Sequence, residues 1–348
     1  MERKIENRQL LNIITLFAIV QFSGFLITIY ALGPVELYAA PVVSPSSSVA
    51  MAVTYMLYII ATAVVIILLI RFVKGDILFV LLEAFVVLFA TAFLLFILLS
   101  SALPNLNYLY AGAAAVAITL ILIIAKNFRP SLRNFIAITS SIGVGVVIGL
   151  NGFNLAYMLL LLIAIYDYVA VFITKHMLVL AKAVSSRNLA FLIGSSDVEA
   201  IPKKYVTAKD RTEFRKSVDM KDVKDPTIKQ LVASGAIPVI SQVQLGTGDL
   251  ALPLTLTVSA YVSFLNYLIP TMIIFGSICG MVFTMYLLKK YRVALPAIPP
   301  IFAFINLFLS IAFVATRTSQ WELWVGFFLV FVITLVILLS KLRRNDSK

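Results

Sequence analysis

The sequence predicts an all-α polytopic membrane protein with about nine or ten transmembrane helices. Of its 348 residues, 61% are hydrophobic and only 13% are charged, and the mean hydropathy is +1.04. Long runs carry no charged residue at all, whereas a soluble domain of this length needs a charged surface. The chain is therefore expected to be built mainly of helices that cross a bilayer.

Ten apolar runs are close to the roughly 17 to 25 residues that a membrane-spanning helix needs. The first follows basic residues, as in a signal peptide, but it is too long for one and is interpreted as an anchor. The runs cover residues 10–32, 49–70, 77–102, 108–125, 135–151, 154–174, 238–261, 265–288, 296–315 and 321–340.

The basic residues follow the order of these runs. Of 28 Lys and Arg residues, 27 lie in the N-terminus, in every second loop and in the C-terminus, and the exception is Arg317. The positive-inside rule therefore predicts that the N-terminus, residues 175–237 and the C-terminus are cytoplasmic. The net charge of +12 then belongs to a face that favours anionic lipid, and we expect no nucleic-acid partner.

Three parts follow along the chain. Residues 1–174 hold six predicted spans, residues 175–237 form a hydrophilic cytoplasmic loop, and residues 238–348 hold the remaining spans. The loop mixes basic and acidic residues and is too polar to pack a core alone. It is interpreted as mobile, with a substrate-gating or self-cleaved segment as the alternative.

Several chemistries are excluded by scarcity. His176 is the only histidine and lies at the polar end of a run, which excludes a His-rich zinc site, an HExxH helix and a Ser-His protease. Cys279 is the only cysteine, so no intramolecular disulfide forms. We expect neither a metal nor a cofactor.

The acidic residues of the apolar runs are few. Apart from Glu322 at the very start of the tenth run, they are Glu83, Asp167 and Asp249. A carboxylate at membrane depth is costly, and no Lys or Arg lies inside any run, so we expect no neutralising salt bridge for these three. Glu83 lies near the end of its run and is interpreted as a structural residue that snorkels to the interface.

Asp167 and Asp249 are predicted to form one site. Asp167 lies roughly 12 Å from the end of its helix and Asp249 nominally ~17 Å from the start of its run, both from the cytoplasmic side. Two carboxyl groups that share one proton avoid the cost of two neighbouring charges. One carboxylate then activates water while its protonated partner polarises a carbonyl, which is the chemistry of peptide-bond hydrolysis.

A proline-rich segment opens the ninth run. Pro296, Pro299 and Pro300 lie within five residues, which is incompatible with the interior of a regular helix. Unpaired backbone at membrane depth is tolerated only where it lines a cavity or is buried in protein, and there it could pair with an extended substrate. The simpler interpretation is a proline start to a helix.

These motifs together resemble the presenilin and signal peptide peptidase family of GxGD intramembrane aspartyl proteases. The resemblance rests on Tyr166-Asp167, on Gly246 to Asp249 and on Pro296 to Ile298, and it spans residues 1 to about 315. It implies a presenilin-like bundle whose sixth and seventh helices carry the catalytic Asp167 and Asp249. It further implies that the site is shaped by Tyr166, Gly246, Gly248, Pro296, Ala297 and Ile298.

The resemblance carries further expectations. The family's Pro-Ala-Leu is Pro-Ala-Ile here, and the tenth run exceeds the family's usual nine spans. The compact chain resembles archaeal homologues, which implies an archaeal cell membrane. The predicted N-in orientation resembles presenilin, which implies single-span transmembrane or signal-peptide-like substrates with cytoplasmic C-termini, besides membrane lipids as partners.

Two other functions stay open on the sequence. Glycine- and proline-broken helices with intramembrane carboxylates are also features of ion- or proton-coupled transporters and channels. The prepilin-peptidase branch of GxGD enzymes would lack the proline element before the ninth run.

Overall fold

The computed structural model describes residues 7–32, 45–72, 77–126, 130–174, 192–202, 236–291, 295–316 and 321–346. Over these residues the chain forms ten helices and two strands, so the predicted fold class is confirmed. One helix overlaps each predicted run, including the tenth. The helices are α1 (Asn7–Leu32), α2 (Pro45–Phe72), α3 (Ile77–Ala102), α4 (Tyr108–Ala125), α5 (Pro130–Gly149), α6 (Phe153–Phe172), α10 (Thr247–Phe264), α11 (Leu268–Tyr291), α12 (Ile298–Ala315) and α13 (Trp321–Asp346).

Seven of the described helices contain stretches long and apolar enough to cross a membrane. These stretches lie in α1, α3, α4, α5, α6, α11 and α12. A chain with several such helices is a multi-pass integral membrane protein.

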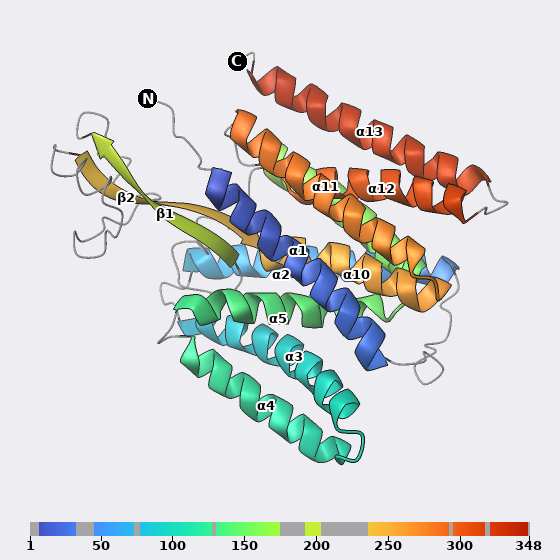
Figure 1. Cartoon of the computed structure of the whole chain (residues 1–348). Helices are drawn as coiled ribbons and strands as arrows, with labels where there is room; N and C mark the ends of the chain where they lie inside the picture. Colours follow the sequence, from blue (N-terminus) through green and yellow to red (C-terminus); the bar gives the residue numbers. More distant parts are fainter. Residues whose placement is uncertain are drawn as a thin grey trace. The chain divides into compact units, whose positions relative to one another are not determined.

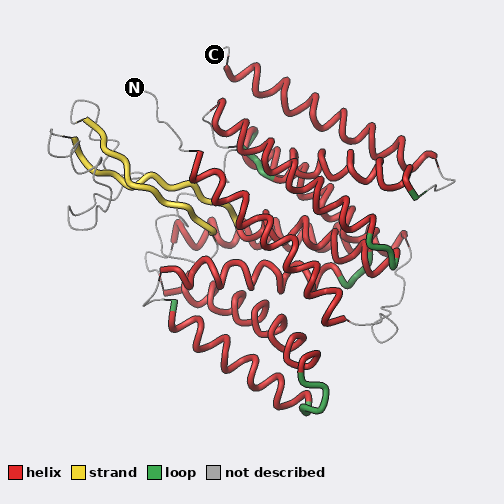
Figure 2. The backbone as a smooth tube through the Cα atoms, in the orientation of Figure 1, coloured by secondary structure: helices red, strands yellow, loops and turns green. Residues whose placement is uncertain are grey.

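The chain divides into two compact units, one of which contains a small sheet. This unit comprises residues 1–15 and 193–245. Strands β1 (Leu192–Pro202) and β2 (Ala236–Gly246) pair in a two-stranded sheet, drawn in yellow in Figure 2. The prediction of a helix from residue 238 is therefore wrong at its start, because the chain is extended until Gly246 and helical only from Thr247.

The sheet also corrects part of the predicted loop. Residues 192–202 and 236–237 of the 175–237 segment are strand. Residues 175–191 and 203–235, which make up most of the loop interpreted as mobile, lie outside the described residues.

The second unit, residues 16–192 and 246–348, is the helical bundle. Helix α10 packs against α5, α6 and α11, while α12 packs against α6, α11 and α13. Helix α3 lies between α4 and α5, as the lower part of Figure 1 shows. Helices α10 and α12, together with α2, therefore pack against α6, which carries Asp167.

Close helix packing depends on glycine at three positions of α5. A Cβ atom at Gly143 would lie 2.0 Å from the backbone oxygen of Ala90 in α3. Cβ atoms at Gly145 and Gly149 would lie within 3.1 Å of backbone or side-chain atoms of α10. Lipid is as apolar as the side chains, so helices associate through such close contacts, which glycine permits at these positions.

Glu83 has an ionic partner, contrary to the prediction. Its side chain is buried in α3, and Lys126, the residue after α4, forms a salt bridge with it. The expectation failed because it counted only basic residues inside the apolar runs, and a lysine one residue beyond a helix end is long enough to reach inward. Glu83 is thus a buried ion-pair residue and does not snorkel.

Candidate active site

Asp167 lies near the C-terminal end of α6, with only 8% of its surface exposed. One carboxylate oxygen, Oδ2, accepts a hydrogen bond from the backbone N–H of Ile298 at 3.3 Å. The N–H of Ala297 also donates to this carboxylate. The side chain of Asp167 is therefore held by the first residues of α12.

The prolines of α12 explain why these donors face Asp167. The first N–H groups of a helix have no partner within the helix. In α12, which begins at Ile298, Pro299 and Pro300 have no N–H to satisfy, so the free donors are those of Ala297 and Ile298. Both are taken up by Asp167, so these two N–H groups are not left open for a substrate strand.

Asp249 lies in the first turn of α10, as the third helical residue after the N-cap Gly246. The backbone N–H of Gly246 donates to its carboxylate, which is the arrangement of the N3 residue in a capping box. A Cβ atom at Gly246 would lie 3.3 Å from Oδ2 of Asp249. The absence of a side chain at this glycine lets the carboxylate fold back over the backbone.

The two carboxyl groups lie close enough to interact. Helices α6 and α10 pack against each other, and Asp167 acts electrostatically on Asp249. Each carboxyl group also lies at a helix N-terminus, where backbone N–H groups and the helix dipole favour negative charge. Helices α6 and α10, which lie in the sixth and seventh runs, therefore bring the two aspartates together.

The other predicted site residues differ in their placement. Tyr166 is half-buried beside Asp167, and Pro296 is buried just before α12. Gly248 is exposed, and a Cβ atom there would meet nothing within 4 Å. Gly246, Ala297 and Ile298 therefore contact the carboxyl groups directly, while Gly248 leaves open space beside Asp249.

Two polar side chains near Asp249 were missed by the sequence reasoning. Ser141 of α5 donates to the carbonyl of Thr247 at 3.2 Å, and Gln21 of α1 donates to the carbonyl of Leu250 at 2.9 Å. They escaped because only ionisable residues were considered within the apolar runs. A buried glutamine in an otherwise apolar helix is the signal that could have identified Gln21.

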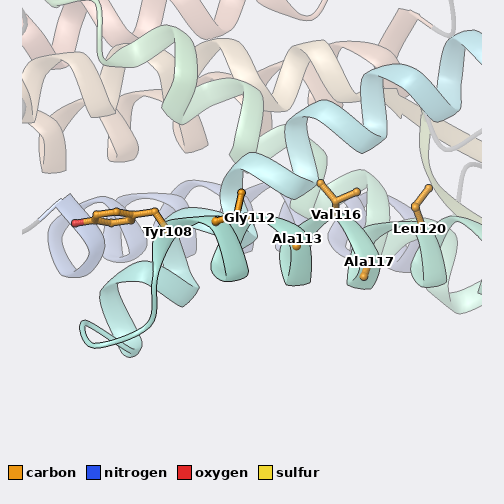
Figure 3. Close-up of a pocket in the computed structure, with 7 residues that line it drawn as sticks. Tyr108, Gly112, Ala113, Val116, Ala117 and Leu120 are labelled. Carbon is orange, nitrogen blue, oxygen red and sulfur yellow. The ribbon is translucent and has the colours of Figure 1, made fainter.

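An apolar hollow elsewhere in the bundle has no such chemistry. It lies along α4, and Figure 3 shows its lining of aliphatic, small and tyrosine side chains. Its residues are Tyr108, Leu109, Gly112, Ala113, Val116, Ala117 and Leu120, none of which is charged. The candidate active site is therefore placed at the two aspartates.

A bundle of apolar helices that brings two carboxyl groups together at helix N-termini is the arrangement expected of an aspartyl protease working in the bilayer. The comparisons with known proteins agree. The chain belongs to the signal-peptide peptidase, presenilin aspartyl protease family, which it matches over residues 14–318. It is an intramembrane aspartyl protease, and the transporter alternative is not favoured.

Solved structures resemble the fold. One structure of a presenilin family intramembrane aspartate protease, in space group P2, has a TM-score of 0.55 and 18% identity, covering 86% of this chain and 96% of that one. A second, in space group C222, has a TM-score of 0.56 and 17% identity, covering 88% and 99%. A comparison with curated proteins finds no match. Helix α13 begins after the family match ends.

Proposed function

We propose that Asp167 and Asp249 are the catalytic pair of this protease. The supporting observation is that Asp167 accepts two backbone N–H groups at the start of α12 and Asp249 accepts one at the start of α10, while the two carboxyl groups interact. The remaining residues of the proposed site shape it, either by contact or by leaving space. They are Tyr166, Gly246, Gly248, Pro296, Ala297 and Ile298.

The chemistry needs one carboxyl group in each protonation state. The ionised carboxylate takes a proton from water, whose oxygen attacks the carbonyl carbon of the scissile peptide. The protonated partner donates a hydrogen bond to the carbonyl oxygen, and a proton then passes to the leaving nitrogen as the C–N bond breaks. The two groups titrate as a pair, so the roles of acid and base belong to the pair and not to fixed residues.

The donors that hold the Asp167 carboxylate are backbone N–H groups, so its orientation does not depend on a flexible donor side chain. Backbone donors at a helix start are fixed by the helix itself, and Pro299 and Pro300 restrict the backbone that follows. Asp249 is held in the same way by the N–H of Gly246. The pair therefore meets water with its orientation already set.

The test is conversion of each aspartate to asparagine, which keeps the shape but cannot ionise. Asp167→Asn and Asp249→Asn should each abolish cleavage of a model transmembrane peptide by the detergent-purified full chain, with fragments read by mass. Thr257→Val, a change to a buried hydroxyl two turns beyond Asp249 in α10, serves as the matched control and should retain cleavage. Substantial cleavage by either asparagine variant would refute the assignment.

We further propose that the substrates are single-span transmembrane or signal-peptide-like segments with cytoplasmic C-termini, cut in an archaeal cell membrane. The distribution of 27 of 28 basic residues supports an enzyme whose N-terminus, 175–237 segment and C-terminus are cytoplasmic, flanked by the two groups of spans, 1–174 and 238–348. Reconstituted enzyme should cut a model substrate inserted with this polarity and leave the inverted one intact. Equal cleavage of both would contradict the proposed orientation preference.

A further inference from the structure

One face of α1 contacts α10 at several positions within the helical bundle. Phe17, Gln21, Gly24 and Thr28 are spaced four, three and four residues apart and therefore share one face of α1. A Cβ atom at Gly24 would lie 2.4 Å from the Leu254 side chain of α10, so α1 approaches α10 closely. Further along, the rings of Phe25 and Tyr261 pack edge to face with centroids 5.8 Å apart.

Gln21 is a polar residue on this buried face, fully shielded from solvent. Its Nε2 donates to the carbonyl of Leu250 at 2.9 Å, the residue next to Asp249. Its Oε1 is buried and, among the described residues, has no hydrogen-bond partner. An unpaired buried amide oxygen costs free energy, about 1 to 3 kcal/mol, so stability alone does not explain a glutamine here.

The carbonyl that Gln21 binds lies where α10 is weakened. Pro253 has no N–H to donate to the carbonyl of Asp249, four residues earlier, and its ring crowds that same carbonyl. The turn that carries Asp249 is therefore joined to the rest of α10 by one hydrogen bond fewer than usual. A proline at this point of a helix permits a kink, which would move Asp249 relative to Asp167.

Two side chains from neighbouring helices hold this turn from outside. Ser141 binds the carbonyl of Thr247, and Gln21 binds the carbonyl of Leu250, so the two bonds flank Asp249 in sequence. Ser141 also donates to Ala137 in its own helix at 2.7 Å, which divides its donor between two acceptors. Gln21 has no competing acceptor among the described residues and is the stronger restraint.

We propose that Gln21 is a positioning residue that fixes the Asp249 turn against the kink at Pro253, and so sets the distance between the two carboxyl groups. This role rests on the proposed catalytic function of Asp249. Gln21 itself contacts neither the attacking water nor the substrate. It acts through the Leu250 carbonyl, and its contribution is to the rate of the chemical step, not to substrate binding.

The first test replaces Gln21 with methionine, whose side chain is also unbranched but has no N–H donor. Gln21→Met should lower kcat about tenfold, because small misplacements of catalytic groups are costly in rate, and should leave KM within about twofold. The thermal midpoint of the purified full chain should stay level or rise, since the unpaired Oε1 is removed. Reduced kcat at unreduced stability separates positioning from a structural role.

The second test asks whether the donor itself matters. Gln21→Glu keeps an O–H donor when the new side chain is protonated and presents only acceptors to the Leu250 carbonyl when it is ionised. Its kcat relative to wild type should therefore be highest at the acidic end of the pH range and fall as pH rises. The same ratio for Gln21→Met should be independent of pH.

Thr28→Val is the matched control, because Thr28 shares the buried face and its hydroxyl bonds only within α1, to Gly24 at 2.8 Å. It should retain wild-type kcat. Wild-type kcat in Gln21→Met would overturn the positioning role, and so would a ratio of Gln21→Glu kcat to wild-type kcat that does not change with pH. If Asp249→Asn is inactive in the same assay, the catalytic pair is unaffected by that result. Activity in Asp249→Asn would instead overturn the proposed function itself.

Discussion

Replacing Gly246 by alanine is the smallest change that should move Asp249 without disturbing the fold. The backbone of Gly246 has φ −67° and ψ 142°, which any residue adopts, so alanine introduces no backbone strain there. Its methyl group would instead lie 3.3 Å from Oδ2 and 3.8 Å from Cγ of the Asp249 carboxylate. Only the contact with the carboxylate is tight.

The expected loss of rate follows from the size of the displacement. Ordinary contact between carbon and another heavy atom is about 3.5 to 4.0 Å, so the carboxylate must retreat by roughly 0.3 Å. A misplacement of about 1 Å costs about a hundredfold in rate. If the logarithm of the rate falls in proportion to the displacement, a shift of about 0.3 Å lowers kcat about fourfold. The thermal midpoint should be unchanged.

The assay is steady-state cleavage of a model transmembrane peptide by the purified enzyme, analysed for kcat and KM separately. Gly248→Ala is the comparison, because its methyl group would meet nothing within 4 Å. That variant should keep its kcat, and any loss should be in KM if substrate occupies the open space. Full kcat in Gly246→Ala, or a larger kcat loss in Gly248→Ala, would refute the reasoning.

The remaining predictions concern packing. Leu338→Ala should lower the free energy of unfolding by about 2 kcal/mol, because Leu338 of α13 is only 2% exposed. Leu339→Ala, at a residue that is 38% exposed, should leave the thermal midpoint unchanged. Equal effects of the two changes would contradict the described packing of α13. Gly143→Ala should lower the free energy of unfolding by about 3 kcal/mol, since its methyl group would lie 2.0 Å from the Ala90 oxygen and both helix backbones would have to separate. Gly112→Ala, whose nearest contact is 3.9 Å, should fold normally, and a wild-type midpoint for Gly143→Ala would show that α3 and α5 pack less closely than described.

The helices and the two aspartates could be predicted because each leaves a local signal. A span of about 20 apolar residues needs no partner to be recognised, and Asp167 and Asp249 stand out by the cost of a carboxyl group at depth. The predicted closeness of the pair came from counting residues to the cytoplasmic end. The hydrogen bonds from Ala297 and Ile298 to Asp167 could not be predicted, because they join residues far apart in the sequence. Ile298, for example, lies 131 positions after Asp167.

The errors also have particular causes. Strand β2 was predicted as the start of a span because its apolar content was read without its period, although Gln242, Val243, Gln244 and Leu245 alternate polar and apolar as a strand does. Glu83 was expected to have no basic partner because Lys126 lies just outside its run. Gln21 was overlooked because its role depends on which helix packs against it.

The burial of α10 affects how transmembrane topology is predicted for related sequences. Residues 253–261 of α10 are all buried within the protein, so neighbouring helices and not lipid surround it, and α10 is absent from the seven described helices that pass as spans by length and hydropathy. The predicted run 238–261 reached span length with apolar residues of β2, so a count applied to the helix alone would skip this crossing, and one skipped crossing inverts the side assigned to every later segment. For relatives built this way, correct topology then requires that the GxGD segment be counted as a crossing on the strength of its aspartate.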